Sequence, residues 1–212
     1  MMTVVSFAIR VLERFARFIT AMCGHLVMRA SGAQLGSNLR LYGIPIVSRS
    51  RGAAICIGDR VVLCSDSRYT ALGVNHPVIL RAMRPGATIV VGNDVGMSGA
   101  TLCAMTRVII GDQTMLGANV TIADTDFHSL NPDGRRHSQE GVATAPVTIG
   151  RNVFIGMNSV VLKGVTIGDN SVIGANSLVT RDIPADVIAA GNPCRMIRSL
   201  RDCVFQAVEV AE

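Results

Sequence analysis

Aliphatic residues recur at every sixth position in the segment from residue 149 to residue 184. The leading positions of the repeats hold Ile149, Ile155, Val161, Ile167, Ile173 and Val179. A small or β-branched residue follows four places later in each repeat: Val153, Ser159, Val165, Ser171, Ser177 and Ile183. This period predicts one short strand and one corner in each hexapeptide. The leading aliphatic residue points inward, and a following glycine relieves the backbone at the turn.

The hexapeptide pattern predicts an array of stacked coils. Three corners close one coil, and inward residues of successive coils stack at the spacing of paired strands, about 4.8 Å. No single coil can bury its inner face alone, so the repeat must be an array. A less regular form of the pattern lies upstream at Ile57-Gly58, Val91-Gly92, Ile110-Gly111, Leu116-Gly117 and Ile122. We therefore expect a mainly β body over residues 35–190.

Two segments interrupt the repeat, and we expect them to form loops that project from it. The first covers residues 64–88 and contains Asn75, His76 and Pro77. The second, residues 123–146, is polar, charged and rich in turn-forming residues. Loops held by a rigid scaffold are where chemistry usually takes place.

The two ends of the chain follow a helical pattern instead. In residues 1–34, apolar residues recur at three- and four-residue steps, and Arg10, Arg14 and Arg17 share the opposite side. The apolar stripe consists of Val4, Phe7, Val11, Phe15, Phe18, Ile19 and Met22. It either docks on the rest of the protein or a neighbouring subunit, or lies on an anionic membrane surface. The charges within residues 4–23 argue against an export signal or a membrane span.

The segment 191–212 is expected to cap the other end of the array. Its apolar residues are spaced for a short amphipathic helix: Met196, Ile197, Leu200, Val204 and Phe205. The run Ala189-Ala190-Gly191-Asn192-Pro193 marks the end of the array, where this segment begins.

Composition agrees with a folded protein whose core is aliphatic. Hydrophobic residues make up 49% and charged residues 17%, whereas aromatic residues are only 4%. The net charge is +5, but the basic residues are scattered and aromatic stacking platforms are nearly absent, so no nucleic-acid partner is expected. The six cysteines contain no CxxC pair and are read as buried thiols of a reducing, cytoplasmic compartment: Cys23, Cys56, Cys64, Cys103, Cys194 and Cys203.

Three features together resemble the hexapeptide-repeat acetyltransferases, in particular the galactoside, maltose, nodulation-factor and exopolysaccharide O-acetyltransferases. They are the regular repeat, the DTDFH sequence at residues 124–128 and the AAGNPCRMIR sequence at residues 189–198. The segments 75–77 and 91–96 look most like enzymes of extracellular-polysaccharide pathways such as colanic acid synthesis. The resemblance implies a left-handed parallel β-helix, a homotrimer with active sites between subunits, and acetyl-CoA as cosubstrate.

His128 is the candidate catalytic residue. A sugar hydroxyl is a poor nucleophile while the acetyl thioester is already activated, so the main catalytic need is a base that removes the hydroxyl proton. His128 lies in the second loop, and either Asp124 or Asp126 could orient its ring and stabilise the protonated form. The resemblance implies the same general-base role for His128, with direct transfer in a ternary complex.

The binding residues are carried over from the resemblance. For coenzyme A they are Met157, Ala175, Thr180, Arg181, Arg195 and Arg198. Met157 departs from the serine that galactoside enzymes carry. The acceptor-binding asparagine of those enzymes is also absent, since the corresponding region reads Met97-Ser98-Gly99. Ser98 or Asn93 could replace it, and His76 could reach an acceptor from its own loop. Lys163, beside Gly164, is interpreted as an exposed turn residue.

Other functions remain open at this stage. An N-acetyltransferase of an amino sugar, or a serine or antibiotic acetyltransferase, would use the same base. A carbonic-anhydrase-type metal enzyme is disfavoured because His76, His128 and His137 lack the spacing of a zinc site, so no metal is expected. A non-catalytic trimeric scaffold would not need so long a polar loop. A lipid-linked sugar acceptor would bring the protein to the inner membrane face through residues 4–23.

Overall fold

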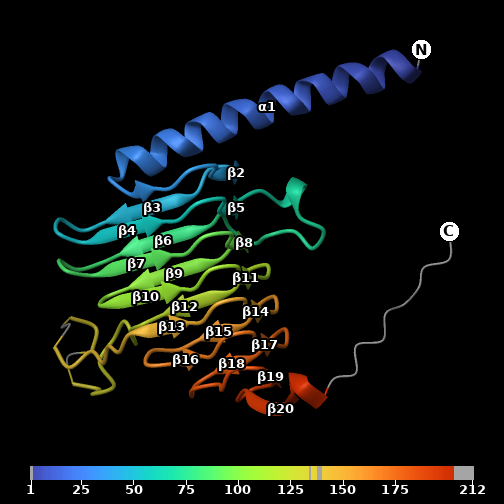
Figure 1. Ribbon diagram of the computed structural model, residues 1–212. Coiled ribbons are helices and arrows are strands. Elements are labelled where there is room, and N and C mark those ends of the chain that lie inside the picture. The colour runs from blue at the N-terminus through green and yellow to red at the C-terminus, as the bar shows by residue number, and fades with distance from the viewer. Residues whose placement is uncertain (1, 134, 138–139, 203–212) are drawn as a thin grey trace.

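The computed structural model describes residues 2–133, 135–137 and 140–202, and in the first helix it describes side chains from Glu13 onward. One helix, α1 (Met2–Ala30), precedes the short strands β1 to β20, and two 3-10 turns, η1 (Ser67–Tyr69) and η2 (Leu200–Asp202), interrupt them. Figure 1 shows α1 lying across one end of a stack of strands that continues coil by coil to the other end.

The strands form three sheets. The first contains β1 (Gln34–Leu35), β4 (Ala54–Ile57), β7 (Thr88–Val91), β10 (Arg107–Ile110), β13 (Val147–Ile149) and β16 (Thr166–Ile167). The second contains β2 (Arg40–Tyr42), β5 (Val62–Cys64), β8 (Gly96–Ser98), β11 (Met115–Leu116), β14 (Phe154–Ile155), β17 (Val172–Ile173), β19 (Val187–Ala190) and β20 (Arg195–Ser199). The third contains β3 (Ile46–Arg49), β6 (Ile79–Ala82), β9 (Thr101–Ala104), β12 (Thr121–Ala123), β15 (Val160–Val161) and β18 (Leu178–Val179).

From β1 to β18, each coil contributes one strand to each sheet, which makes the body a parallel β-helix. Leading residues of successive coils pair directly, as in Ile149 with Ile167 and Ile155 with Ile173. The predicted fold class is therefore confirmed. We call the turn between the first and second sheets corner 1, that between the second and third corner 2, and that between the third and first corner 3.

The repeat positions form the core as predicted. None of the six leading residues is more than 1% exposed. The serines of the second set are buried as well, and each hydroxyl donates to a carbonyl oxygen: Ser159 and Ser177 to Gly174, and Ser171 to Pro184. Inward serines thus satisfy the backbone at the corners without breaking the aliphatic columns.

The role predicted for the repeat glycines is wrong in one respect. At corner 2 the positive φ falls two residues after the glycine, at Asn158 (57°) and Asn176 (56°), because asparagine tolerates left-handed backbone. A Cβ on Gly156 would instead lie 2.5 Å from the backbone nitrogen of Ala175 in the next coil. The close approach of stacked coils, rather than the turn, therefore requires the glycine.

The first interruption of the repeat is shorter than predicted. Within residues 64–88, β6 pairs with β3 on one side and with β9 on the other. Val78, which directly precedes β6, and Leu80 and Ala82 within it are buried with a period of two, which a search for a period of six does not detect. The projecting loop is thus limited to residues 65–78.

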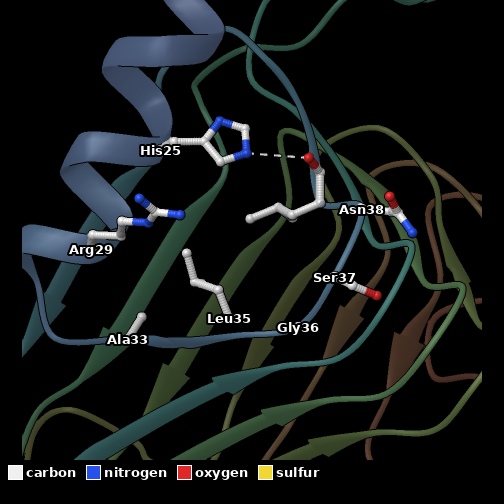
Figure 2. Close-up of a pocket in the computed structure, with 8 residues that line it drawn as sticks. His25, Arg29, Ala33, Leu35, Gly36, Ser37 and Asn38 are labelled. Atoms are coloured by element: carbon white, nitrogen blue, oxygen red, sulfur yellow. Dashed lines mark hydrogen bonds between the residues drawn. The ribbon is translucent and has the colours of Figure 1, made fainter.

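The C-terminal half of α1 covers the first coil. Met28 is fully buried, and a Cβ on Gly24 would lie 2.9 Å from Cδ1 of Leu41, so helix and coil are in close contact. His25 reaches from the helix to the first coil, where its Nε2 lies 3.2 Å from the carbonyl oxygen of Leu39 (Figure 2). The predicted N-terminal helix is confirmed, and it caps the exposed end of the array.

The described part of the apolar stripe of α1 is largely not packed on the β-helix of its own chain. Four large side chains along the helix are exposed: Phe15, Phe18, Met22 and Leu26. The side chains of Val4, Phe7 and Val11 lie outside those described. Among the described residues, no helix has both the length and the hydropathy that crossing a membrane requires.

The last part of the body forms a strand where the sequence pattern predicts a helix. β20 runs antiparallel to β19 and is followed by η2. Met196 and Ile197 are exposed, and Val204 and Phe205 lie outside the described residues. The physical reason is that β19 leaves an open sheet edge, and pairing with it satisfies more backbone groups than a short exposed helix would.

Candidate active site

The second loop leaves the β-helix at corner 3, between β12 and β13, through a short antiparallel neck. Thr125 and Thr144 form a β-bridge across this neck. The N–H of Asp126 donates to the carbonyl oxygen of Ala143 at 3.1 Å, and that of Ala145 donates to Asp124 at 2.9 Å. These hydrogen bonds fix the base of the loop. His128 lies two residues after Asp126, the last residue held in this way.

His128 is presented by a tight, strained turn. Its N–H donates to the carbonyl oxygen of Asp126 at 2.7 Å, across Phe127, whose φ is +62°. A hydrogen bond of this span with a positive φ is the pattern of the rare γ-turn, and such strain concentrates at functional sites. The N–H of Phe127 is held by Oγ1 of Thr125 at 3.1 Å. The imidazole of His128 is consequently exposed at the edge of the β-helix on a fixed backbone.

Asp126 is held by a residue of the next coil. Nζ of Lys163 lies 2.7 Å from its Oδ1, and both side chains are largely buried. The other oxygen, Oδ2, is buried without a hydrogen-bond partner in the part of the chain that is described. Lys163 is thus no exposed turn residue, which corrects the interpretation from sequence. Because the repeat pairs Ile122 with Val161, the register alone puts Lys163 beside this neck.

Asp124 has a different role from the one expected. It is fully buried, and its carboxylate accepts four hydrogen bonds: from the N–H groups of Met105, Thr106 and Arg107 and from the hydroxyl of Thr106, at 2.6–2.7 Å. All of these partners belong to the preceding coil. The structure therefore gives Asp124 a structural function, and of the two aspartates only Asp126 has a carboxylate oxygen without a hydrogen-bond partner among the described residues.

The candidate acceptor residues lie at other corners of the chain. Ser98 ends β8 at corner 2, and His76 is nearby, since a Cβ on Gly99 would lie 2.9 Å from its carbonyl oxygen. Asn93 lies at corner 1, where its Oδ1 accepts the N–H of Asp59 at 2.8 Å. The side chain of Asn93 is thus engaged in a hydrogen bond between stacked coils, which argues against acceptor binding by this residue.

The candidate coenzyme A residues also divide between corners. Met157 and Ala175 stack at corner 2, and Thr180 and Arg181 follow β18 at corner 3, the corner of His128. Arg195 and Arg198 belong to β20, and Nη1 of Arg195 donates to the carbonyl oxygen of Cys194 at 2.8 Å. One chain therefore does not gather these residues on one surface.

Sequence reasoning missed a cavity inside the loop. It has a volume of about 500 Å³ and begins directly after His128. Its lining combines Leu130, Gly141 and Ala143 with the polar and acidic residues Ser129, Asn131, Asp133 and Glu140. The described residues contain no group of three His, Cys, Asp or Glu side chains arranged to hold a metal ion.

The coil geometry and the hexapeptide period together define a hexapeptide-repeat protein. The family described as "Hexapeptide repeat of succinyl-transferase" matches residues 107–123 and 146–181. The first matched stretch ends where the loop that carries His128 begins, and the second begins where that loop ends.

Known sequences and structures include several acetyltransferases that this chain resembles. A galactoside O-acetyltransferase from Escherichia coli K12 is 50% identical over 98 residues, which are 45% of each chain. One from Lactococcus lactis is 44% identical over 109 residues, 51% of each chain. The matched region spans about half the length of these curated relatives. A solved hexapeptide-repeat acetyltransferase from Vibrio cholerae superimposes with a TM-score of 0.53 at 28% identity, covering 86% of this chain and 82% of that one. In sequence and in its left-handed parallel β-helical fold, this chain is similar to the hexapeptide-repeat acetyltransferases.

Proposed function

We propose that this protein transfers an acetyl group from acetyl-CoA to a hydroxyl of a sugar or polysaccharide precursor. The observation that carries the proposal is the presentation of His128 on a rigid neck, two residues beyond the Asp126–Lys163 pair. An exposed imidazole on a fixed backbone can approach a bound hydroxyl, as a general base must. The sequence relatives named galactoside O-acetyltransferase support a sugar as the acceptor.

In the proposed reaction a ring nitrogen of His128 accepts the proton of the acceptor hydroxyl. The hydroxyl oxygen then forms a bond to the thioester carbonyl carbon, and the carbon–sulfur bond breaks. Coenzyme A leaves as a thiolate and receives the proton from the imidazolium, so the histidine returns to its neutral form. Asp126, two residues before His128, is the carboxylate proposed to orient the imidazole during these steps. Transfer is direct, within a ternary complex of protein, acetyl-CoA and acceptor.

We further propose a homotrimer in which two chains complete each site. Corner 3 of one chain would supply His128, Thr180 and Arg181. Corner 2 of its neighbour would supply Met157 and Ala175 for the pantetheine arm, with Ser98 and His76 toward the acceptor. This division explains why the candidate residues occupy two corners of a single chain. Arg195 and Arg198 would lie toward the coenzyme A phosphates, since guanidinium groups pair well with phosphate.

The acceptor is a small-molecule or lipid-linked sugar, and the compartment is the cytoplasm. Thiols stay reduced in the cytoplasm, and the five described cysteines form no disulfide. The loop cavity beyond His128 is a second place where acceptor hydroxyl groups could be recognised, because its carboxylate and amide groups accept hydrogen bonds from sugars.

The test is release of free coenzyme A from acetyl-CoA with a panel of sugars, nucleotide sugars and amino sugars. We expect His128→Ala to lower kcat by about a hundredfold or more, the usual contribution of a general base. His137→Ala, which alters another histidine of the same loop, is the matched control and should remain active. Equal activity of His128→Ala and the native protein would refute the assignment. Products on amino sugars that resist hydroxylamine would be amides and would favour an N-acetyltransferase.

A further inference from the structure

The N-terminal half of α1 extends past the edge of the β-helix, as Figure 1 shows. Along this helix Phe15 is 64% exposed, Phe18 63%, Met22 54% and Leu26 69%. Their spacing of three and four residues places them on one side. Gly24 and Met28, which contact the first coil, lie on another side. The outer surface of this helix is therefore an apolar stripe on which no other described residue of the chain is packed.

Two cavities open beneath the same helix. One, of about 410 Å³, is lined by Glu13, Arg14, Arg17, Arg68 and Tyr69. The other, of about 570 Å³, shares Arg14 and Arg17 with it and adds Arg40 and Tyr42 among its lining residues. The helix, the first coil and η1 thus bring four arginines and both tyrosines of the chain to one place.

These arginines carry more positive charge than their surroundings neutralise. Arg68 is paired with Asp66 at 2.6 Å, and Glu13 is the other carboxylate near the cavities. Across the described part of the chain, no ion pair involves Arg14, Arg17 or Arg40. The Tyr42 and Tyr69 rings lie 5.2 Å apart. A tyrosine hydroxyl can donate to an anion, as guanidinium groups do, so the chemistry of the cavities fits phosphate.

We propose that α1 attaches this protein to a membrane surface that carries anionic lipid. The stripe Phe15, Phe18, Met22 and Leu26 enters the boundary between headgroups and acyl chains, and Arg14, Arg17 and Arg40 bind lipid phosphates at the flank of the helix. An amphipathic helix with phenylalanines on one side and arginines on the other is the usual form of an interfacial anchor. Membrane attachment extends the part of the proposed function in which the acceptor is a lipid-linked sugar. The evidence for the attachment itself comes from the exposed apolar stripe and the arginines.

A second copy of the chain is a poorer occupant of the stripe. A symmetric contact through α1 would bring Arg14 and Arg17 of one copy near those of the other, and each copy has a net charge of +5. An anionic lipid surface neutralises the same arginines. In the proposed trimer the three helices lie at the same end, so a membrane would engage all of them at once and the attachment would be strengthened by multivalency.

The experiment is sedimentation of the full-length protein with vesicles of phosphatidylcholine alone and of phosphatidylcholine mixed with phosphatidylglycerol. We expect binding to the anionic vesicles. The double variant Arg14→Gln/Arg17→Gln should weaken it about twenty-five-fold, since each arginine contributes about fivefold near a charged surface. The variant Phe15→Ser/Phe18→Ser should weaken it by about a hundredfold, from about tenfold for each phenylalanine. Arg151→Gln and Ile197→Ser, exposed residues away from α1, are the matched controls and should bind as the native protein does.

Three results would overturn the proposal. One is equal sedimentation of both double variants and their controls. Another is full competition by inorganic pyrophosphate with no effect of Phe15→Ser/Phe18→Ser, which would identify a site for a free phosphorylated molecule. The third is a smaller oligomer of the phenylalanine variant in light scattering with unchanged vesicle binding, which would identify a second copy as the occupant. Acetyl transfer to soluble acceptors should be the same in all variants, so failure here is distinguishable from failure of the proposed reaction.

Discussion

Nζ of Lys163 lies 2.7 Å from Oδ1 of Asp126, and the carbonyl oxygen of the same aspartate accepts the N–H of His128 at 2.7 Å. The coil that follows the loop therefore holds the residue on which the candidate base depends. Lys163 is the only lysine among the twenty lysines and arginines of the chain. A compact ammonium group reaches a single carboxylate oxygen in a narrow space, for which a planar guanidinium is less suited.

Replacement of Lys163 should impair catalysis more than folding. In Lys163→Met the Asp126 carboxylate loses its partner and the neck is free to shift, so we expect kcat to fall about tenfold or more while KM for acetyl-CoA changes little. Steady-state kinetics of Lys163→Met and Asp126→Asn, with the double variant, measures the coupling. If the pair acts as one unit, the double variant should be no worse than the poorer single variant. Additive losses would mean that the two residues act independently.

Asp124 should be required for stability and not for chemistry. Asp124→Ala leaves the backbone N–H groups of residues 105–107 without their acceptor in a buried place, which should lower the free energy of unfolding by about 3 kcal/mol or more. Denaturant unfolding followed by circular dichroism measures this loss. The folded fraction should keep its activity per molecule. A variant of normal stability that is inactive would instead restore Asp124 as the residue that orients His128.

The glycines at coil corners should differ sharply in their tolerance of a methyl group. A Cβ on Gly111 would lie 2.5 Å from backbone atoms of Gly150, whereas a Cβ on Gly96 meets no atom within 4 Å. We expect Gly111→Ala to destabilise the protein by about 2 kcal/mol, the usual cost of overpacking, and Gly96→Ala to be nearly neutral. Thermal unfolding of the two variants side by side checks this. Equal losses would show that chain entropy, and not coil contact, sets the requirement.

The buried thiols should be slow to react. Burial raises the pKa of the Cys64, Cys103 and Cys194 thiols, so less thiolate is present at pH 8 than in a free cysteine. Alkylation by iodoacetamide at pH 8, read residue by residue by mass spectrometry, should label Cys23 and Cys56 before these three. Because their folded-state pKa lies above the unfolded value, stability should decline as the pH rises above about 8.5, where the unfolded chain loses these protons first. Labelling in urea is the control and should remove the difference.

Much of the architecture could be predicted because it is local. A period of six in aliphatic residues is set by the length of one strand and one corner, so Ile149 to Val179 specify the inward face without knowledge of their neighbours. The positions of the loops followed from breaks in that period. The sequence pattern did not predict strand β6, because its period of two lies within a shifted register. It did not predict strand β20, because the spacing of its apolar residues also suits a helix.

The sequence by itself determined the stacked coils, the loop that carries His128 and the helix at the N-terminus, since each depends on spacing along the chain. Only the tertiary structure decided which aspartate is free, because the bonds that occupy Asp124 come from the preceding coil and the lysine that holds Asp126 comes from the following one. It likewise decided that the stripe of α1 faces outward, since the close contact at Gly24 selects the docking side. Contacts between coils join residues far apart in sequence, and no local pattern records them.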